Sequence, residues 1–508
     1  MKKILYSLFS RFALVAVSIV AQVAVLAVMI GRFSARFTEF YWICMLMSFA
    51  AALAIVCSKS DPGYKIVWLI LFLPFPVFGG VFYLLFSGWQ KPRRMRRLTQ
   101  ETKERLSGAL SGDMQGNALD ALGRDTAMQT RYLEQWACCP AYMDSAAEYL
   151  AGGEEYFARM MEELERAERY IFLEYFIIEE GRMWNTILDL LIRKAARGVD
   201  VRVMYDDVGS IFTLTRNYRK KLEEKGIRCQ VFNRFMPVIS RLVNNRDHRK
   251  LCIVDGKVAF TGGINLADEY INEKTRFGHW KDSGILVRGG AAWSMTVVFL
   301  NMWAIVTKRA EDFSALRPAA TEAADAAGVI QPYLDSPLDE ENVGQNVYLN
   351  MISHARDHIY ITTPYLIPDS ATNTALCQAA KSGVDVCVIT PHIPDKKAVF
   401  QVTRAHYPAL LEAGVKIYEY TPGFLHAKNF IVDDRFATVG TINLDFRSLF
   451  LHFENGVLLC HAPCIQSVKE DFERTLRASE RITLRGVRDA NLLVRLWRSI
   501  LRVFAPLL

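Results

Sequence analysis

The sequence DHRKLCIVD at positions 247–255 recurs as LHAKNFIVD at positions 425–433. Both copies contain the pattern His-x-Lys-x4-Asp, carried by His248, Lys250 and Asp255 in the first and by His426, Lys428 and Asp433 in the second. An asparagine follows each copy at the same distance, first Asn265 and then Asn443, so both offsets are 178 residues (426 − 248 and 443 − 265). This register predicts one active site built by two similar halves.

The segments around the two motifs predict the same order of strands and helices. GVDVRVMY at 198–205 is matched by GVDVCVIT at 383–390, and GIRCQVF at 226–232 is matched by GVKIYEY at 414–420. Strands that alternate with helices are typical of an α/β fold with a largely parallel sheet. We therefore predict two tandem lobes, 151–313 and 342–482, joined by a linker over 314–341 and arranged as a pseudo-two-fold dimer.

Residues 1–90 are rich in long apolar stretches and predict an α-helical transmembrane region. Three stretches approach the ~20 apolar residues that a spanning helix needs: Phe12–Ile30, Phe40–Cys57 and Ile66–Phe86. A cleaved signal peptide is the alternative for the first stretch. However, no small-residue cleavage motif stands out and further apolar segments follow, so we favour a retained anchor.

A basic connector over 91–150 follows the apolar region and begins with KPRRMRR at 91–97. Positive charge beside a membrane span favours the cytoplasmic face and attracts anionic lipid headgroups. This pattern places the catalytic part on the cytoplasmic side. Three full crossings would then put Lys2 and Lys3 outside, against their charge, so the number of crossings stays open.

The C-terminal segment, 483–508, predicts a basic amphipathic helix. Arg495, Arg498 and Arg502 recur at helical spacing, and leucines together with Trp497 fill the opposite face. Such a helix is typical of a membrane surface. An apolar stripe of this kind is equally typical of a helix that caps a globular core.

The paired motif has the groups that phosphodiester chemistry needs. One imidazole can attack phosphorus and form a phosphohistidine, and a second can donate a proton to the leaving oxygen. Lysine ammonium groups and the amides of Asn265 and Asn443 can hold the non-bridging oxygens. In an extended segment, alternate residues point to the same face, so each histidine is expected beside its lysine.

An imidazole in this role needs a carboxylate that fixes its tautomer. Asp255 and Asp433 are one option, but both precede turns and are expected to be mainly structural. Asp282, in HWKDSGILV, and Glu454, in HFENGVLL, each precede a strand-like run. We favour Asp282 and Glu454 as the residues that orient the histidines.

A metal site is a weaker interpretation of the same residues. Lysine is not a usual metal ligand, and no Cys/His cluster accompanies the motifs. The ten cysteines show no metal-ligand spacing and are expected to be reduced. No metal is therefore predicted. A purely structural role for the histidines is also disfavoured, because the motif occurs twice in register.

The twin motif resembles that of the phospholipase D superfamily, and longer blocks resemble the bacterial cardiolipin synthases. These blocks are NNRDHRKLCIVDGKVAFTGGINLADEY at 244–270, HWKD at 279–282, TPYLIPD at 363–369 and GFLHAKNFIVDDRFATVGTINLDFRSLFLHFE at 423–454. The resemblance implies a phosphatidyltransferase without a cofactor, embedded in the bacterial inner membrane by several passes. Its substrate would be phosphatidylglycerol and its products cardiolipin and glycerol, with no nucleic-acid partner; a homo-oligomer is left open.

By the same resemblance, His248 is assigned as the nucleophile and His426 as the general acid and base, although the two halves are nearly symmetric. Arg241 and Arg246 are candidates for the second lipid phosphate, with solvated loop charges as the alternative. Other functions use the same residues. A hydrolase would take water as acceptor, a superfamily nuclease would use the basic runs on nucleic acid, and an inactive scaffold would only bind anionic lipid.

Overall fold

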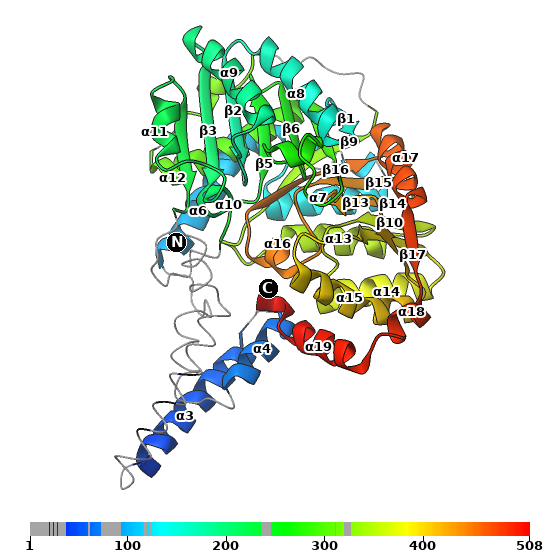
Figure 1. The fold of residues 1–508 in the computed structure, drawn as a ribbon. Helices are drawn as coiled ribbons and strands as arrows, with labels where there is room; N and C mark the ends of the chain where they lie inside the picture. Colours follow the sequence, from blue (N-terminus) through cyan, green and yellow to red (C-terminus); the bar gives the residue numbers. More distant parts are fainter. Residues whose placement is uncertain are drawn as a thin grey trace.

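The computed structural model describes residues 37–58, 61–72, 93–115, 119–121, 123–234, 245–309, 311–319 and 327–507, with the isolated residues 20, 24 and 28. Two large mixed sheets form the two lobes, the first above the second in the view of Figure 1. The predicted α/β class with two tandem lobes agrees with this architecture. The likeness between the lobes is clearest in the order of their strands.

The first sheet has the order β1-β8-β6-β5-β2-β3-β4. Its strands are β1 Ala146–Leu150, β2 Tyr170–Tyr175, β3 Asp200–Asp206, β4 Arg228–Phe232, β5 Lys250–Val254, β6 Val258–Gly262 and β8 Gly284–Arg288. Strands β2, β3 and β4 are parallel, and the pairs β2–β5, β5–β6, β6–β8 and β8–β1 are antiparallel.

The second sheet repeats this arrangement in the order β17-β12-β11-β10-β14-β15-β16-β9. Its strands are β9 Val329–Asp335, β10 His358–Thr362, β11 Asp385–Pro391, β12 Lys416–Tyr420, β14 Asn429–Val432, β15 Phe436–Gly440, β16 Glu454–Cys460 and β17 Ser479–Ile482. Parallel pairing is again confined to β10, β11 and β12.

The expected largely parallel sheet is therefore wrong, and both sheets are mixed. The reason lies in the turns after the motifs. Only three residues, 255–257, separate β5 from β6, and three, 433–435, separate β14 from β15. A parallel crossover needs a dozen or more residues, so these strands form hairpins. Asp255 and Asp433 make the turns, with left-handed φ values of 54° and 53°.

Two long helices fill the space between the sheets. α12 Gly290–Thr307 follows β8 and packs on the first sheet, and α17 Cys464–Arg477 follows β16 and packs on the second. Each helix also contacts the edge strand of the other sheet, α12 with β9 and α17 with β1. Among the described residues, α12 alone is long and apolar enough to cross a membrane, but 83% of it is buried inside the protein, so it is a core helix.

Further helices cover the outer faces. α8 Gly153–Arg166, α9 Arg182–Ala196 and α11 Tyr218–Glu223 belong to the first lobe; α7 Arg124–Ala137, α13 Val343–Ser353, α14 Ser370–Lys381 and α15 Lys397–Glu412 pack in the second. Parts of the predicted connector and linker form strands of the two sheets. The end of the connector forms β1 and the end of the linker forms β9, because each edge strand hydrogen-bonds along a sheet.

The predicted membrane region is described only in part. α3 Phe37–Val56 coincides with the second apolar stretch, and α4 Pro62–Phe72 covers the beginning of the third. The first stretch and the end of the third lie outside the described residues. α3 extends away from the two lobes (Figure 1). The C-terminal helix α19 Leu492–Val503 packs against α15 and α4.

Candidate active site

Each His-x-Lys segment is hydrogen-bonded to the backbone of the opposite lobe. The backbone N–H of His248 donates to the carbonyl of Phe453, and the backbone N–H of His426 donates to the carbonyl of Lys281. Phe453 precedes Glu454 and Lys281 precedes Asp282. Each histidine is thereby held beside the carboxylate of the other half.

The side chains complete this crossed arrangement. His248 Nδ1 lies 2.9 Å from Oε1 of Glu454, and His426 Nδ1 lies 2.7 Å from Oδ2 of Asp282. Both carboxylates are fully buried, and the two histidines are 8% and 7% exposed. With Nδ1–H donating to a carboxylate, the lone pair of a neutral imidazole is on Nε2. This tautomer suits attack on phosphorus.

Electrostatics keeps both imidazoles neutral in the free protein. Burial lowers the pKa of His426 to about 4, aided by the charge of Lys428, while Asp282 opposes the shift. Burial also lowers the pKa of His248, followed by the charges of Lys250, Lys428 and His426. These influences run between the lobes, so both motifs share one electrostatic environment.

The motif lysines lie on the same buried surface. The Nζ atoms of Lys250 and Lys428 donate to the carbonyls of His248 and His426 within their own motifs. Burial lowers the pKa of Lys250 to about 7 and that of Lys428 to about 8. An anionic phosphate bound nearby would favour their charged forms.

Asp255 and Asp433 lie away from the imidazoles. Asp255 accepts hydrogen bonds from the backbone N–H groups of residues 168–170, and Asp433 accepts from those of residues 356–358. A strand rises about 3.3 Å per residue, so seven residues of extended chain put roughly 20 Å between each motif's ends. These carboxylates therefore brace the entries of the neighbouring strands.

The two asparagines are buried beside hydroxyl groups. Asn265 Nδ2 donates to the hydroxyl of Tyr270, whose ring centroid lies 5.7 Å from that of His426. Asn443 Nδ2 donates to Ser448, and its Oδ1 has no hydrogen-bond partner among the described residues. Each amide NH2 group has a second proton, which is available for a phosphate oxygen.

Of the two candidate phosphate ligands before the first motif, the structure describes Arg246. Arg246 is only 4% exposed, and it donates to Asp206 and to the carbonyl of Asn233. It is therefore a buried partner of Asp206 rather than a solvated loop charge. Arg241 lies outside the described residues.

Sequence reasoning missed the groups that line the carboxylates. Thr441 donates to Oε2 of Glu454 at 2.5 Å, whereas Gly263 is its counterpart in the first half. A Cβ on Gly263 would lie 2.0 Å from Oδ1 of Asp282, so only glycine leaves room there. Trp280 and His452 stand two residues before the carboxylates, a spacing that is visible in the sequence.

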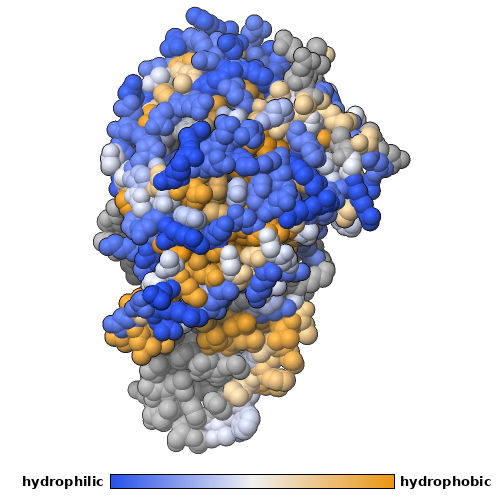
Figure 2. Space-filling model, turned by 90° about the vertical axis from the view of Figure 1, so that its right-hand side faces the viewer, coloured by the Kyte–Doolittle hydropathy of each residue, from blue (hydrophilic) through white to orange (hydrophobic). Residues whose placement is uncertain are grey.

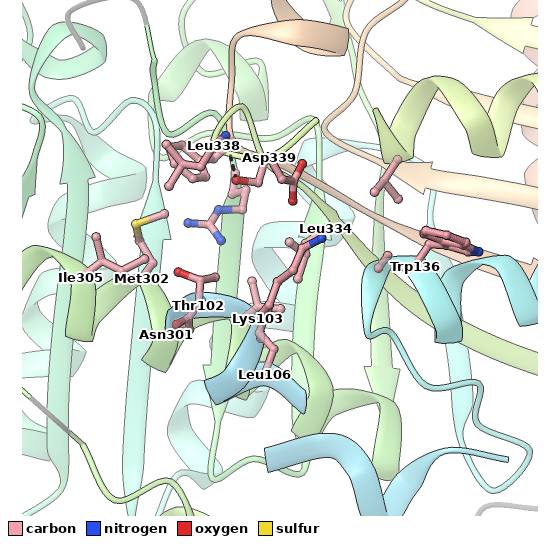
Figure 3. Close-up of a pocket in the computed structure, with 16 residues that line it drawn as sticks. Thr102, Lys103, Leu106, Trp136, Asn301, Met302, Ile305, Leu334, Leu338 and Asp339 are labelled. Atoms are coloured by element: carbon pink, nitrogen blue, oxygen red, sulfur yellow. Dashed lines mark hydrogen bonds between the residues drawn. The ribbon is translucent and has the colours of Figure 1, made fainter. Parts of the chain in front are cut away.

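A separate pocket lies on the far side of the first motif. It is lined by Thr102, Lys103 and Leu106 of α6 Arg93–Leu110, by Asn301, Met302 and Ile305 of α12, and by Leu334, Leu338 and Asp339 (Figure 3). Arg249, between His248 and Lys250, also lines it. The cavity measures about 40 Å³, and neither His248 nor His426 is among the residues that line it.

Known proteins resemble both the lobes and the apolar N-terminal region. A family described as "Cardiolipin synthase, PLD-like domain" matches residues 160–276 and 348–476, and one described as "Phospholipase_D-nuclease N-terminal" matches residues 47–88. A cardiolipin synthase of Halalkalibacterium halodurans is 35% identical over 462 residues, 90% of this chain and 91% of that protein. The chain belongs to the bacterial cardiolipin synthases of the phospholipase D superfamily.

A second cardiolipin synthase, from Alkalihalophilus pseudofirmus, is 33% identical over 485 residues and covers 94% of both chains. Among solved structures, a phosphatidylserine synthase of Haemophilus influenzae matches with a TM-score of 0.58 at 15% identity, over 75% of this chain and 97% of that one. This likeness shows a common fold. The resemblance of the motif blocks to the cardiolipin synthases is thus confirmed.

Proposed function

We propose that this chain transfers a phosphatidyl group from one phosphatidylglycerol to another, giving cardiolipin and glycerol. The observation that carries the proposal is the crossed pair of buried imidazoles, each hydrogen-bonded through Nδ1 to a carboxylate of the other half. A matched pair of nucleophile and acid is what double displacement at phosphorus needs. One chain supplies both halves, as a pseudo-two-fold dimer.

In the first step, Nε2 of His248 attacks the phosphorus of the donor lipid. A P–N bond forms and the bond from phosphorus to the glycerol oxygen breaks. His426, protonated once the anionic lipid is bound, gives its proton to the departing glycerol oxygen. Glu454 stabilises the charge that develops on the attacking ring.

In the second step, the free headgroup hydroxyl of another phosphatidylglycerol attacks the phosphohistidine. His426, now neutral, takes the proton of that hydroxyl, the P–N bond breaks, and His248 is regenerated. Lys250, Lys428, Asn265 and Asn443 hold the non-bridging oxygens in both steps, where negative charge accumulates. The two steps balance and no cofactor is assigned to either.

We further propose that the protein lies at the bacterial inner membrane, with its lobes on the cytoplasmic side and several passes in the N-terminal region. Apolar residues gather at the end of the molecule that carries α3, α4 and α19 (Figure 2). On α19, Leu492, Leu493, Leu496 and Trp497 are each more than half exposed. Leu501 packs inward in a small cluster with Val402 and Phe446, so one face caps the second lobe and another is free to meet lipid.

The decisive test is a lipid assay with the full chain in mixed micelles. Purified protein is incubated with phosphatidylglycerol and a chelator, and the lipids are separated by chromatography. We expect equimolar cardiolipin and glycerol, and loss of both in His248→Ala and in His426→Ala. Phosphatidic acid as the main product would favour a hydrolase instead, and full activity of either variant would refute the two-histidine mechanism.

A further inference from the structure

The two halves of the site differ in the residue that stands two positions before each carboxylate. Trp280 and His452 each stand two residues before the carboxylate that serves the opposite imidazole. Trp280 Nε1 donates to Asp282 at 3.3 Å, and its ring centroid lies 5.4 Å from that of His426. His452 occupies the matching place beside His248, with 5.6 Å between the ring centroids. One half thus carries an indole where the other carries a third imidazole.

His452 is poised for a ligand. Its side chain is 11% exposed, and neither ring nitrogen has a hydrogen-bond partner among the described residues. Its Nδ1 lies 3.7 Å from Oε1 of Glu454, beyond hydrogen-bond distance. A buried polar nitrogen without a partner destabilises the fold, so a group that could bind it would be stabilising.

Three potential ligand atoms converge at this point. One atom from each of His248, His452 and Glu454 lies within 4.8 Å of the other two, and all three residues are shielded from solvent. Two imidazole nitrogens and one carboxylate oxygen form a common zinc donor set, which leaves a fourth position for water. The corresponding place in the other half cannot ligate, because an indole N–H has no free lone pair.

We propose that His248, His452 and Glu454 bind a divalent transition-metal ion such as Zn²⁺, and that the bound ion inhibits the enzyme. Coordination through Nδ1 of His248 shifts the single ring proton to Nε2. No proton is released, but Nε2 loses the lone pair with which it would attack phosphorus. Coordination through Nε2 would occupy that lone pair directly.

In this proposal the ion inhibits the reaction and is not a cofactor for it. Its binding depends only on the three side chains, whereas its inhibitory effect rests on the proposed function of His248. Binding and inhibition are therefore measured separately. Coordination at either ring nitrogen removes the Nε2 lone pair that attacks phosphorus, so the ion-bound chain should not form the phosphohistidine.

Binding is measured on the chelator-treated full chain in detergent, by competition for Zn²⁺ with a chromogenic chelator and by the visible spectrum of bound Co²⁺. We expect one ion per chain, with a four-coordinate cobalt spectrum. His452→Asn should weaken binding by at least about 10–100-fold. His392→Asn is the matched control, because His392 also contacts a buried glutamate, with 2.9 Å from its Nδ1 to Oε2 of Glu419. This variant should bind Zn²⁺ as tightly as the unmodified chain.

A chain that binds no stoichiometric ion, or a His452→Asn variant that binds as tightly as the control, would overturn the site. His452→Gln replaces the asparagine variant if the latter fails to fold, as judged by gel filtration and thermal unfolding.

Inhibition is then measured as the rate of cardiolipin formation with Zn²⁺, relative to each variant's own metal-free rate. Unmodified protein and His392→Asn should be inhibited and recover with chelator, whereas His452→Asn should resist. An ion that binds without slowing the reaction would overturn the inhibitory role. A metal-free chain that makes no cardiolipin would count against the proposed function and leave the binding result standing.

Discussion

The Nδ1 atom of His426 lies 2.7 Å from Oδ2 of Asp282, although 144 residues separate them and each belongs to a different lobe. The pairing of His248 with Glu454 spans 206 residues in the opposite sense. Neither lobe therefore orients its own histidine. Each lobe contributes the imidazole of one pair and the carboxylate of the other.

Replacing Asp282 by asparagine should disable His426 without unfolding the protein. The carboxylate raises the pKa of His426 against the effect of burial, so its loss lowers that pKa further and removes the acceptor that fixes the tautomer. We expect kcat to fall by about 10²–10⁴-fold, the usual range for general acid–base catalysis. Cardiolipin formation at saturating substrate measures the loss, and Asp282→Glu should recover part of it. Unchanged kcat in Asp282→Asn would exclude this positioning role.

Gly263→Ala should have a similar effect through sterics alone. The new Cβ would lie 2.0 Å from Oδ1 of Asp282, so the carboxylate must move away from His426. We expect a fall in kcat of at least about 10-fold, since catalytic geometry tolerates little displacement. Gly198→Ala is a control for glycine replacement in general, because no atom lies within 4 Å of a Cβ there, although its φ of +89° makes some loss of stability expected. Equal kcat values for the two variants would contradict the steric argument.

Asp255→Asn should separate stability from catalysis. Asparagine tolerates the left-handed backbone at this position but replaces a charged acceptor that serves three backbone N–H groups. We expect the free energy of unfolding to fall by about 1–3 kcal/mol. The folded enzyme should keep its kcat within about twofold. Thermal unfolding measures the loss of stability, and the rate per folded molecule measures kcat. A large loss of kcat with an unchanged melting temperature would instead show that Asp255 takes part in catalysis.

His406→Leu should stabilise the protein in acid. His406 lies on α15 with both ring nitrogens unpartnered among the described residues, and burial lowers its pKa to about 3. The unfolded chain, with a pKa of about 6.5, binds a proton that the folded chain rejects, so stability falls as the pH drops below about 6.5 and levels off below about 3. At pH 5 this costs about 2 kcal/mol.

The substitution should therefore change the free energy of unfolding by about 2 kcal/mol more favourably at pH 5 than at pH 8. At pH 8 the histidine is neutral in both the folded and the unfolded chain. Denaturant unfolding at the two pH values measures this difference. An identical effect of the substitution at both pH values would show that His406 is protonated in the folded protein.

The sequence predicted the repeat well because its evidence is local. Strand β3 follows from the sequence of a single segment, GVDVRVMY, and the twin motifs follow from spacing. The pairing of each histidine with the other half's carboxylate could not be predicted, because nothing local distinguishes a partner in the same lobe from one in the other. The direction of β5 and β14 was missed for a similar reason, since strand order depends on the short turns at Asp255 and Asp433. The edge strands β1 and β9 were hidden in segments that read as connector and linker, because an edge strand gains its structure from its neighbour.

The crossed carboxylates also bear on how such a chain can change over generations. After the duplication that a tandem repeat implies, most positions of one half can drift independently of the other. Position 282 cannot change independently, because the residues acceptable there depend on the histidine at 426. Position 454 depends in the same way on the histidine at 248. Recombination that replaced one half with that of a distant relative would split both pairs at once. The two halves are therefore expected to be inherited together, with each histidine and its partner carboxylate changing in step.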